Sequence, residues 1–284
     1  MKTIGVLINE IFKSADLIRF AALLGRDIKA KIKVLHVQYP QVQGTPGYMG
    51  AAVVAPTPEQ LQQVSDEAKE AVDEVIKELK AKVSGLPSVE FYSEMGVASA
   101  ILKEKVEDKS YDMVMLQGHA DNSIWLQDSF IMDVVHNVLC PVWIIPPGSV
   151  YRPLNKIVYA TDHYEEDIKT LKSLITLAKP FDPDIIALHI SDSNEFEERL
   201  KSEGFAAMLS EKAGYKKVSV RLIADEDGKD SVESLIYDAE KAGVNLIVVL
   251  KENRNFFERI FRSSFTAELI KKAKLPVLVF HPAG

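Results

Sequence analysis

Short apolar runs and longer amphipathic stretches alternate along the first half of the chain. The apolar runs lie at residues 4–8, 34–37, 89–91, 113–116 and 142–145. Between them, apolar residues recur at the helical spacing of three and four, over residues 17–28, 58–83, 98–106 and 125–139. Nearly continuous apolar strands joined by helices are typical of a parallel sheet that is covered on both faces. The pattern therefore predicts an α/β domain of five parallel strands.

The second half of the chain repeats this order. Its apolar runs lie at 157–161, 185–190, 218–223, 246–250 and 277–280, and its helical patterns lie at 171–178, 195–212, 231–242 and 264–272. KVLHVQ (33–38) matches IALHIS (186–191), and both copies close with a helix, a proline and an apolar strand. A repeat of this length is a duplicated domain. We predict domains at 1–147 and 155–284, with a linker at 148–154 where proline and glycine interrupt both periodicities.

The first copy is longer because it carries an additional segment, PQVQGTPGYMGAAVVAP (40–56). Three glycines favour a disordered excursion, which is one interpretation. The apolar residues around Tyr48 and Val53 allow a second one, in which the segment is a lid over a pocket or a contact with a partner.

Composition narrows the class of protein. The 284 residues include 41 acidic and 34 basic ones, for a net charge of −7, so we expect no nucleic-acid partner. No stretch approaches the roughly 20 apolar residues of a membrane span, and the start of the chain reads as a first strand rather than a signal peptide. A single cysteine, Cys140, excludes an internal disulfide and fits a cytoplasmic location.

A ligand crevice is expected beyond the carboxyl ends of the strands, beside the first strand of each copy. The first strand ends at Asn9 in one copy and at Asp162 in the other, and the second strand ends near Val37 or Ile190. The fourth strand leads into a loop before the last helix. These three segments are the candidate site of each copy.

The residues at the end of each copy resemble the universal stress protein family in its tandem form. DSFIMDVVHNVLCPVWII (128–145) and SSFTAELIKKAKLPVLVF (263–280) match the family's closing helix and strand, and the LHV-type second strand agrees. The resemblance implies two tandem five-stranded parallel-sheet domains with helices on both faces, of the adenine nucleotide alpha hydrolase type. It also implies that 142–145 and 277–280 pair as a pseudo-dimer, and that ATP binds through the motif G-x2-G-x9-G-[ST] with an aspartate at the end of the first strand.

In the first copy the motif falls on Met115, Gly118, Asp128 and Ser129, with Asn9 in place of the aspartate. Gly118 can approach a phosphate through its backbone, and Ser129 can donate to one. Asp128 places a carboxylate near a triphosphate, a repulsion on the order of a few kcal/mol. The alternative interpretation of Asp128 and Ser129 is a helix N-cap.

In the second copy the motif falls on Leu250, Asn253, Ser263 and Ser264, and the aspartate is kept as Asp162. The spacing of the motif is the same in both copies, but no loop glycine remains in the second. The copy also has cations that can attract an anion by charge, or that simply line a solvated loop: Lys251, Arg254, Arg259 and Arg262.

Other reactive residues give no catalytic pattern. His36 and His189 lie in equivalent strands and are interpreted as core imidazoles bonded to backbone, and Cys140 as a small buried side chain. His119, Asp121 and His136 do not have a recognised metal-ligand spacing. We therefore expect no enzyme, no metal and no certain cofactor.

Two functions follow from these observations. One is a stress-response protein with degenerate loops, weak or absent ATP binding, and a signalling or scaffold role with an unknown protein partner. The other is a stress protein that binds an adenine nucleotide or another anionic ligand in one copy. In either case the chain is expected as a monomer with an internal pseudo-dimer, or as a homodimer.

Overall fold

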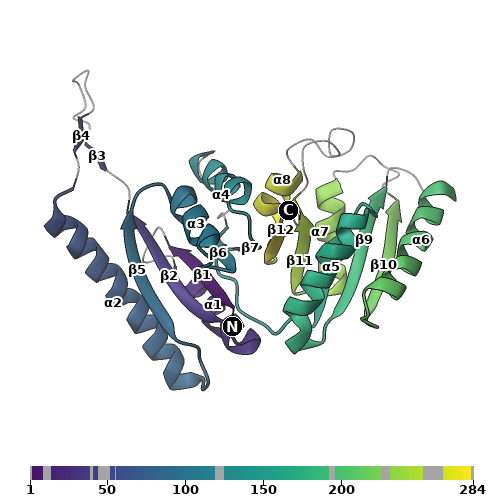
Figure 1. Cartoon of the computed structure of the whole chain (residues 1–284), viewed down its shortest axis with the longest axis horizontal. Helices are drawn as coiled ribbons and strands as arrows, with labels where there is room; N and C mark the ends of the chain where they lie inside the picture. Colours follow the sequence, from purple (N-terminus) through teal and green to yellow (C-terminus); the bar gives the residue numbers. More distant parts are fainter. Residues whose placement is uncertain are drawn as a thin grey trace. The chain divides into compact units, whose positions relative to one another are not determined.

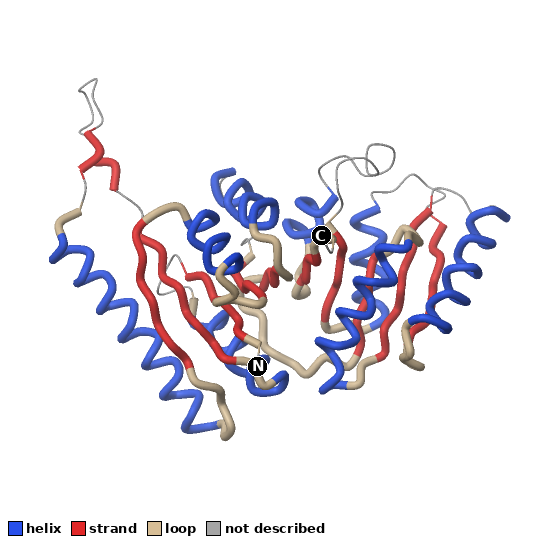
Figure 2. The backbone as a smooth tube through the Cα atoms, viewed as in Figure 1, coloured by secondary structure: helices blue, strands red, loops and turns tan. Residues whose placement is uncertain are grey.

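The computed structural model describes residues 2–8, 14–38, 41–43, 52–54, 56–118, 125–191, 196–224, 231–251 and 265–282. Within them the chain forms two compact units, each an α/β arrangement (Figures 1 and 2). Unit 1 contains residues 1–117 and 133–139, and unit 2 contains residues 118–132 and 140–284.

The first half of the chain alternates strands and helices in the predicted order. Its elements are β1 (Thr3–Ile8), α1 (Ala15–Ile28), β2 (Lys31–Gln38), β3 (Gln41–Gln43), β4 (Ala52–Val54), α2 (Pro58–Lys82), β5 (Val89–Met95), α3 (Ala98–Glu107), β6 (Met113–Gln117), α4 (Trp125–Asn137) and β7 (Val142–Ile145). In unit 1 the strand order is β6-β1-β2-β5, and these pairs are parallel. Right-handed crossovers place α1 and α2 on one face of these strands and α3 on the other.

The second half repeats the arrangement. Its elements are β8 (Lys156–Ala160), α5 (Glu165–Ala178), the 3-10 turn η2 (Lys179–Phe181), β9 (Asp184–Ser191), α6 (Phe196–Lys212), β10 (Val218–Ala224), α7 (Ser231–Ala242), β11 (Leu246–Leu250), α8 (Phe265–Lys272) and β12 (Val277–Phe280). The strands run in the order β10-β9-β8-β11-β12 and pair in parallel. Helices lie on both faces, with α5 and α7 on opposite sides (Figure 1).

Strand β7 completes unit 2 by pairing with β12 in an antiparallel ladder, in which Val142 lies opposite Val279 and Trp143 opposite Leu278. The predicted pairing of the last strands is therefore present. Both strands are fully buried along their length. Trp143 and Tyr159 are the largest fully buried side chains. The α/β class, the parallel strands and the covered faces are confirmed.

Part of the additional segment of the first copy forms two short strands. Its described parts, β3 and β4, pair antiparallel, with Gln41 opposite Val54 and Gln43 opposite Ala52. The excursion thus contains a hairpin ladder between β2 and α2. Whether it acts as a lid stays a prediction.

Candidate functional site

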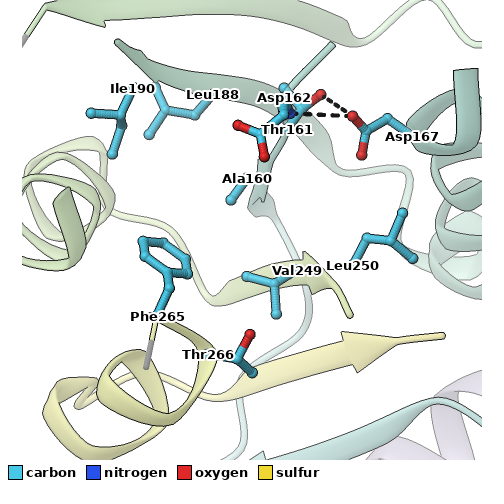
Figure 3. Close-up of a pocket in the computed structure, with 10 residues that line it drawn as sticks. All are labelled: Ala160, Thr161, Asp162, Asp167, Leu188, Ile190, Val249, Leu250, Phe265 and Thr266. Atoms are coloured by element: carbon cyan, nitrogen blue, oxygen red, sulfur yellow. Dashed lines mark hydrogen bonds between the residues drawn. The ribbon is translucent and has the colours of Figure 1, made fainter. Parts of the chain in front are cut away.

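A pocket opens at the carboxyl ends of β8, β9 and β11, beside the first turn of α8 (Figure 3). This is the switch point of the strand order, where β8 lies between β9 and β11. The lining is mainly apolar, with a few hydroxyl and carboxyl groups. It consists of Ala160, Thr161, Asp162, Asp167, Leu188, Ile190, Val249, Leu250, Phe265 and Thr266.

Two aspartates at this pocket face in different directions. Asp162, two residues after the end of β8, directs its carboxylate into the hollow (Figure 3). Asp167, in the first turn of α5, turns toward the backbone of the loop that joins β8 to α5 (Figure 3). Only Asp162 is therefore oriented to meet a ligand.

Asp167 is the centre of a buried hydrogen-bond network. Its Oδ1 accepts from the Tyr159 hydroxyl at 2.5 Å, and its Oδ2 accepts from the Thr161 hydroxyl at 2.8 Å. The backbone N–H groups of Asp162 and Tyr164 donate to the same Oδ2 at 3.2 and 3.0 Å. Burial raises the pKa of Asp167, although the hydrogen bonds from Tyr159, Thr161 and Tyr164 act in the opposite direction. The network fixes the loop that carries Asp162.

A pair of histidines borders Asp162. His189, in β9, lies with Nδ1 2.8 Å from the Thr161 carbonyl oxygen and 3.4 Å from Asp162 Oδ1. Its Nε2 lies 3.5 Å from Oε2 of Glu198 in α6. The ring of His163 is 4.5 Å from the His189 ring, centroid to centroid. The interpretation of His189 as a buried imidazole bonded to backbone is confirmed, but the two carboxylates beside it were not predicted.

At the start of the loop that follows β11, a side chain lines the pocket and the first backbone N–H is already bonded within the sheet. Leu250, the last residue of β11, lines the pocket and is 8% exposed. The next backbone N–H, that of Lys251, donates to the Phe280 carbonyl at 2.7 Å.

Gly118 has a structural role in the first copy. Its N–H donates to the Ile145 carbonyl at 2.8 Å, so this donor is already used within the sheet. A Cβ at this position would lie 3.2 Å from Ile144 Cγ2. Close packing against β7 therefore accounts for the glycine without a phosphate.

The strand pairing does not agree with the alignment of Met115 in the first copy with Leu250 in the second. β6 pairs with β1 so that Met113 lies opposite Ile4, and β11 pairs with β8 so that Leu246 lies opposite Ile157. Ile4 and Ile157 are equivalent in the repeat, so Leu250 corresponds to Gln117 rather than to Met115. Met115 is fully buried inside β6. The closing helices and strands of the two copies do match, but the loops before them differ in length, so the match does not extend through those loops.

The N-cap interpretation of Asp128 and Ser129 is also wrong, because α4 begins at Trp125 and both residues lie inside it. Their side chains, and the residues Asn9, Asn253, Ser263, Ser264, His119, Asp121, Arg254, Arg259 and Arg262, lie outside the described part of the chain. Val37 is buried in β2, whereas Ile190 lines the pocket. The structure thus brings together Asp162 and Ile190 of the predicted set.

Several residues of this site were missed from sequence. Asp167 has one signal, an acidic residue in the first turn of a predicted helix, where such residues satisfy free N–H groups. Thr161, Phe265 and Thr266 adjoin predicted strand or helix ends and could have been included on that ground. Glu198 could not be predicted, because no motif in the sequence links this residue of α6 with His189 in β9.

The remaining predictions concern metal, cysteine and membrane. Among the described residues no cluster of three His, Cys, Asp or Glu side chains is arranged to hold a metal ion. Cys140 is buried, as predicted. No helix in the described ranges is long and apolar enough to cross a bilayer.

Duplication, strand order and a crevice at the switch point define a tandem α/β protein of the doubly wound type. The chain belongs to the universal stress protein family, whose model matches residues 1–146 and 153–281. A universal stress protein of Methanocaldococcus jannaschii is 29% identical over 136 residues, which is 44% of this chain and 80% of that protein.

Solved structures agree on the fold. A universal stress protein from Archaeoglobus fulgidus superposes with a TM-score of 0.71 at 14% identity, covering 98% of this chain and 96% of the other. A putative universal stress protein from Pseudomonas aeruginosa gives a TM-score of 0.61 at 14% identity, covering 99% and 94%. The tandem arrangement predicted from sequence is confirmed.

Proposed function

We propose that this stress-response protein binds ATP weakly or not at all and acts through its folds as a signalling or scaffold protein, without enzymatic activity. The observation that carries the proposal is Leu250. This side chain lines the pocket, at the position to which the sequence resemblance assigns the first glycine of the family's motif. A phosphate bound by backbone N–H groups needs that close approach.

Two further observations support weak binding. The N–H after Leu250 is used by the sheet, because Lys251 donates to Phe280. In the first copy the N–H of Gly118 is used in the same way by Ile145.

A second function is favoured by Asp162. Its carboxylate faces an apolar hollow between Ile190 and Phe265 (Figure 3), an arrangement that suits a ring with hydroxyl groups, such as the ribose of an adenine nucleotide. This candidate would use the second copy alone. The phosphates of such a nucleotide would have to bind beyond Lys251, because the N–H of Lys251 is already bonded to Phe280.

Calorimetric titration of the purified chain with Mg-ATP, and separately with adenosine, tests both functions. We expect no ATP saturation in the micromolar range. A micromolar dissociation constant that is lost in Asp162→Ala and kept in Asp184→Ala, an exposed carboxylate at the opposite end of β9, would refute weak ATP binding.

Mass spectrometry of the denatured protein provides an independent measurement. A stoichiometric nucleotide released from the purified chain would support the second function. Tight adenosine binding without ATP binding would support the binding of ribose by Asp162. It would also agree with a loop that does not bind phosphates.

A further inference from the structure

The His189 ring is placed between oxygen atoms at both of its nitrogens. Nδ1 faces the Thr161 carbonyl at 2.8 Å and Asp162 Oδ1 at 3.4 Å, while Nε2 faces Glu198 Oε2 at 3.5 Å. A neutral imidazole has one N–H and one lone pair, whereas the imidazolium has two N–H groups. A neutral ring would therefore turn a lone pair toward an acceptor, and only the charged ring can donate at both sides.

The neighbouring ring is suited to stay neutral. Both nitrogens of His163 are shielded from solvent and have no hydrogen-bond partner among the described residues. Burial, followed by the proximity of His189, lowers the pKa of His163 to about 4. Phe205 contacts its other side at a centroid distance of 4.8 Å, and His163 holds a left-handed φ of 66°. Two adjacent imidazoles seldom ionise together, so the charge falls on His189.

Glu198 is held in its ionised form by a second cation. Lys201 donates to Glu198 Oε1 at 2.6 Å, which leaves Oε2 for His189. The pKa of Glu198 is lowered, first by this bond with Lys201 and also by His189. Within the described residues, the charged or titratable groups facing His189 are thus Asp162 and His163 from the β8–α5 loop, and Glu198 with Lys201 from α6.

We infer that a proton on His189 clamps the first turns of helix α6 to the loop that carries the pocket carboxylate, through Glu198 on one side and Asp162 on the other. Loss of the proton turns an Nε2 lone pair toward Glu198 and releases α6. His189 is a positioning residue: it fixes Asp162 and the helix beside it without lining the pocket.

The direction of the pH dependence follows from the ring's surroundings. Burial alone would lower the pKa of His189, but the bonds to Asp162 and Thr161 and the charge of Glu198 outweigh it and raise the pKa above 6.5. The clamp therefore contributes fully below the unfolded value of 6.5. Its contribution is lost as the pH rises through the raised value of the folded protein.

The first copy supplies an internal comparison. His36 occupies the equivalent strand position and is buried, with Nδ1 3.2 Å from the Ser93 hydroxyl. Burial lowers the pKa of His36, and no carboxylate is among the causes of its shift. In the part of the chain that the structure describes, this arrangement is thus present in the second copy and not in the first.

A regulatory role for the clamp rests on the second proposed function, in which the pocket binds an adenine nucleotide. The clamp itself does not depend on a ligand. The test is made on the full chain without ligand. Histidine ring signals are followed by NMR between pH 5 and 9, together with hydrogen exchange of α6 corrected for intrinsic rates. We expect His189 to titrate above 6.5 and the first turns of α6 to lose protection across the same pH interval.

Glu198→Gln is the decisive variant, because it keeps the shape of a partly exposed side chain. We expect its His189 midpoint to shift downward and the pH dependence of α6 exchange to disappear. Glu211→Gln, an exposed change on the same helix, and His36→Gln should leave both readouts as in the unchanged protein. A His189 midpoint at or below 6.5, or α6 exchange that does not follow it, would overturn the inference whether or not a nucleotide binds.

Discussion

Asp162 lies in the short loop after β8 and Asp167 in the first turn of α5, and their surroundings give them different roles. Asp167 accepts from two hydroxyl groups and two backbone N–H groups and is 4% exposed. Asp162 faces the pocket and His189. Asp162 could be identified from sequence because it follows a strand end. Asp167 could not, because its four donors converge only after β8, the loop and α5 have packed.

Replacing Asp167 tests its structural role. Asp167→Asn keeps the shape but removes acceptor capacity, so one or more buried donors lose their partner. We expect the second unit to lose about 2 kcal/mol of unfolding free energy, measured by urea denaturation. Glu166→Gln, an exposed change in the same turn, should stay within about 0.5 kcal/mol. Equal effects of the two variants would contradict the network.

The helices that follow the second strand of each copy differ in how many side chains they bury. α2 has 25 residues and buries Ala68, Val72, Ile76 and Leu79 at helical spacing. α6 buries only Phe205 and Leu209, while Phe196 is 77% exposed. Both helices were predicted with nearly correct bounds, because periodicity is local. Sequence could not show that α6 buries fewer side chains than α2, since this depends on which stripe of each helix meets the strands.

Glycines offer a matched test of packing at the scale of elements. Gly204 lies exposed in α6, where an added Cβ would meet no atom within 4 Å, so Gly204→Ala should raise stability by about 0.5–1 kcal/mol through helix propensity. Gly5 lies in β1 against the Tyr111 ring, which a Cβ would overlap, so Gly5→Ala should cost about 1–3 kcal/mol. Thermal unfolding of both variants measures the difference. A destabilised Gly204→Ala would indicate that α6 is covered by a partner.

At the scale of the whole chain, the last strand of the first copy pairs with the last strand of the second. The resemblance to the universal stress protein family implied this pairing, and it agrees with the need of an apolar edge strand for a cover. The loop register could not be predicted in the same way. The pairing of β6 with β1 and of β11 with β8 sets the register of these loops. The match between the closing helices and strands, which revealed the repeat, carries no information on loop length.

The second copy alone should therefore associate. A chain of residues 148–284 lacks β7, which leaves the buried strand β12 without its antiparallel partner. We expect a dimer or larger species by light scattering, at concentrations where the full chain shows less association. A folded monomer of 148–284 would show that β7 is not needed to cover this edge.

The pairing of β7 with β12 also has a consequence for synthesis. β7 leaves the ribosome long before β12 is translated, and at about 5–20 residues per second the interval is roughly 7 to 27 s. During that time the apolar strand Val142–Ile145 has no antiparallel neighbour in its own chain. Two nascent chains on one messenger would present this strand to each other. The protein is therefore most exposed to mispairing of β7 during translation, before β12 has been made, and not after folding is complete.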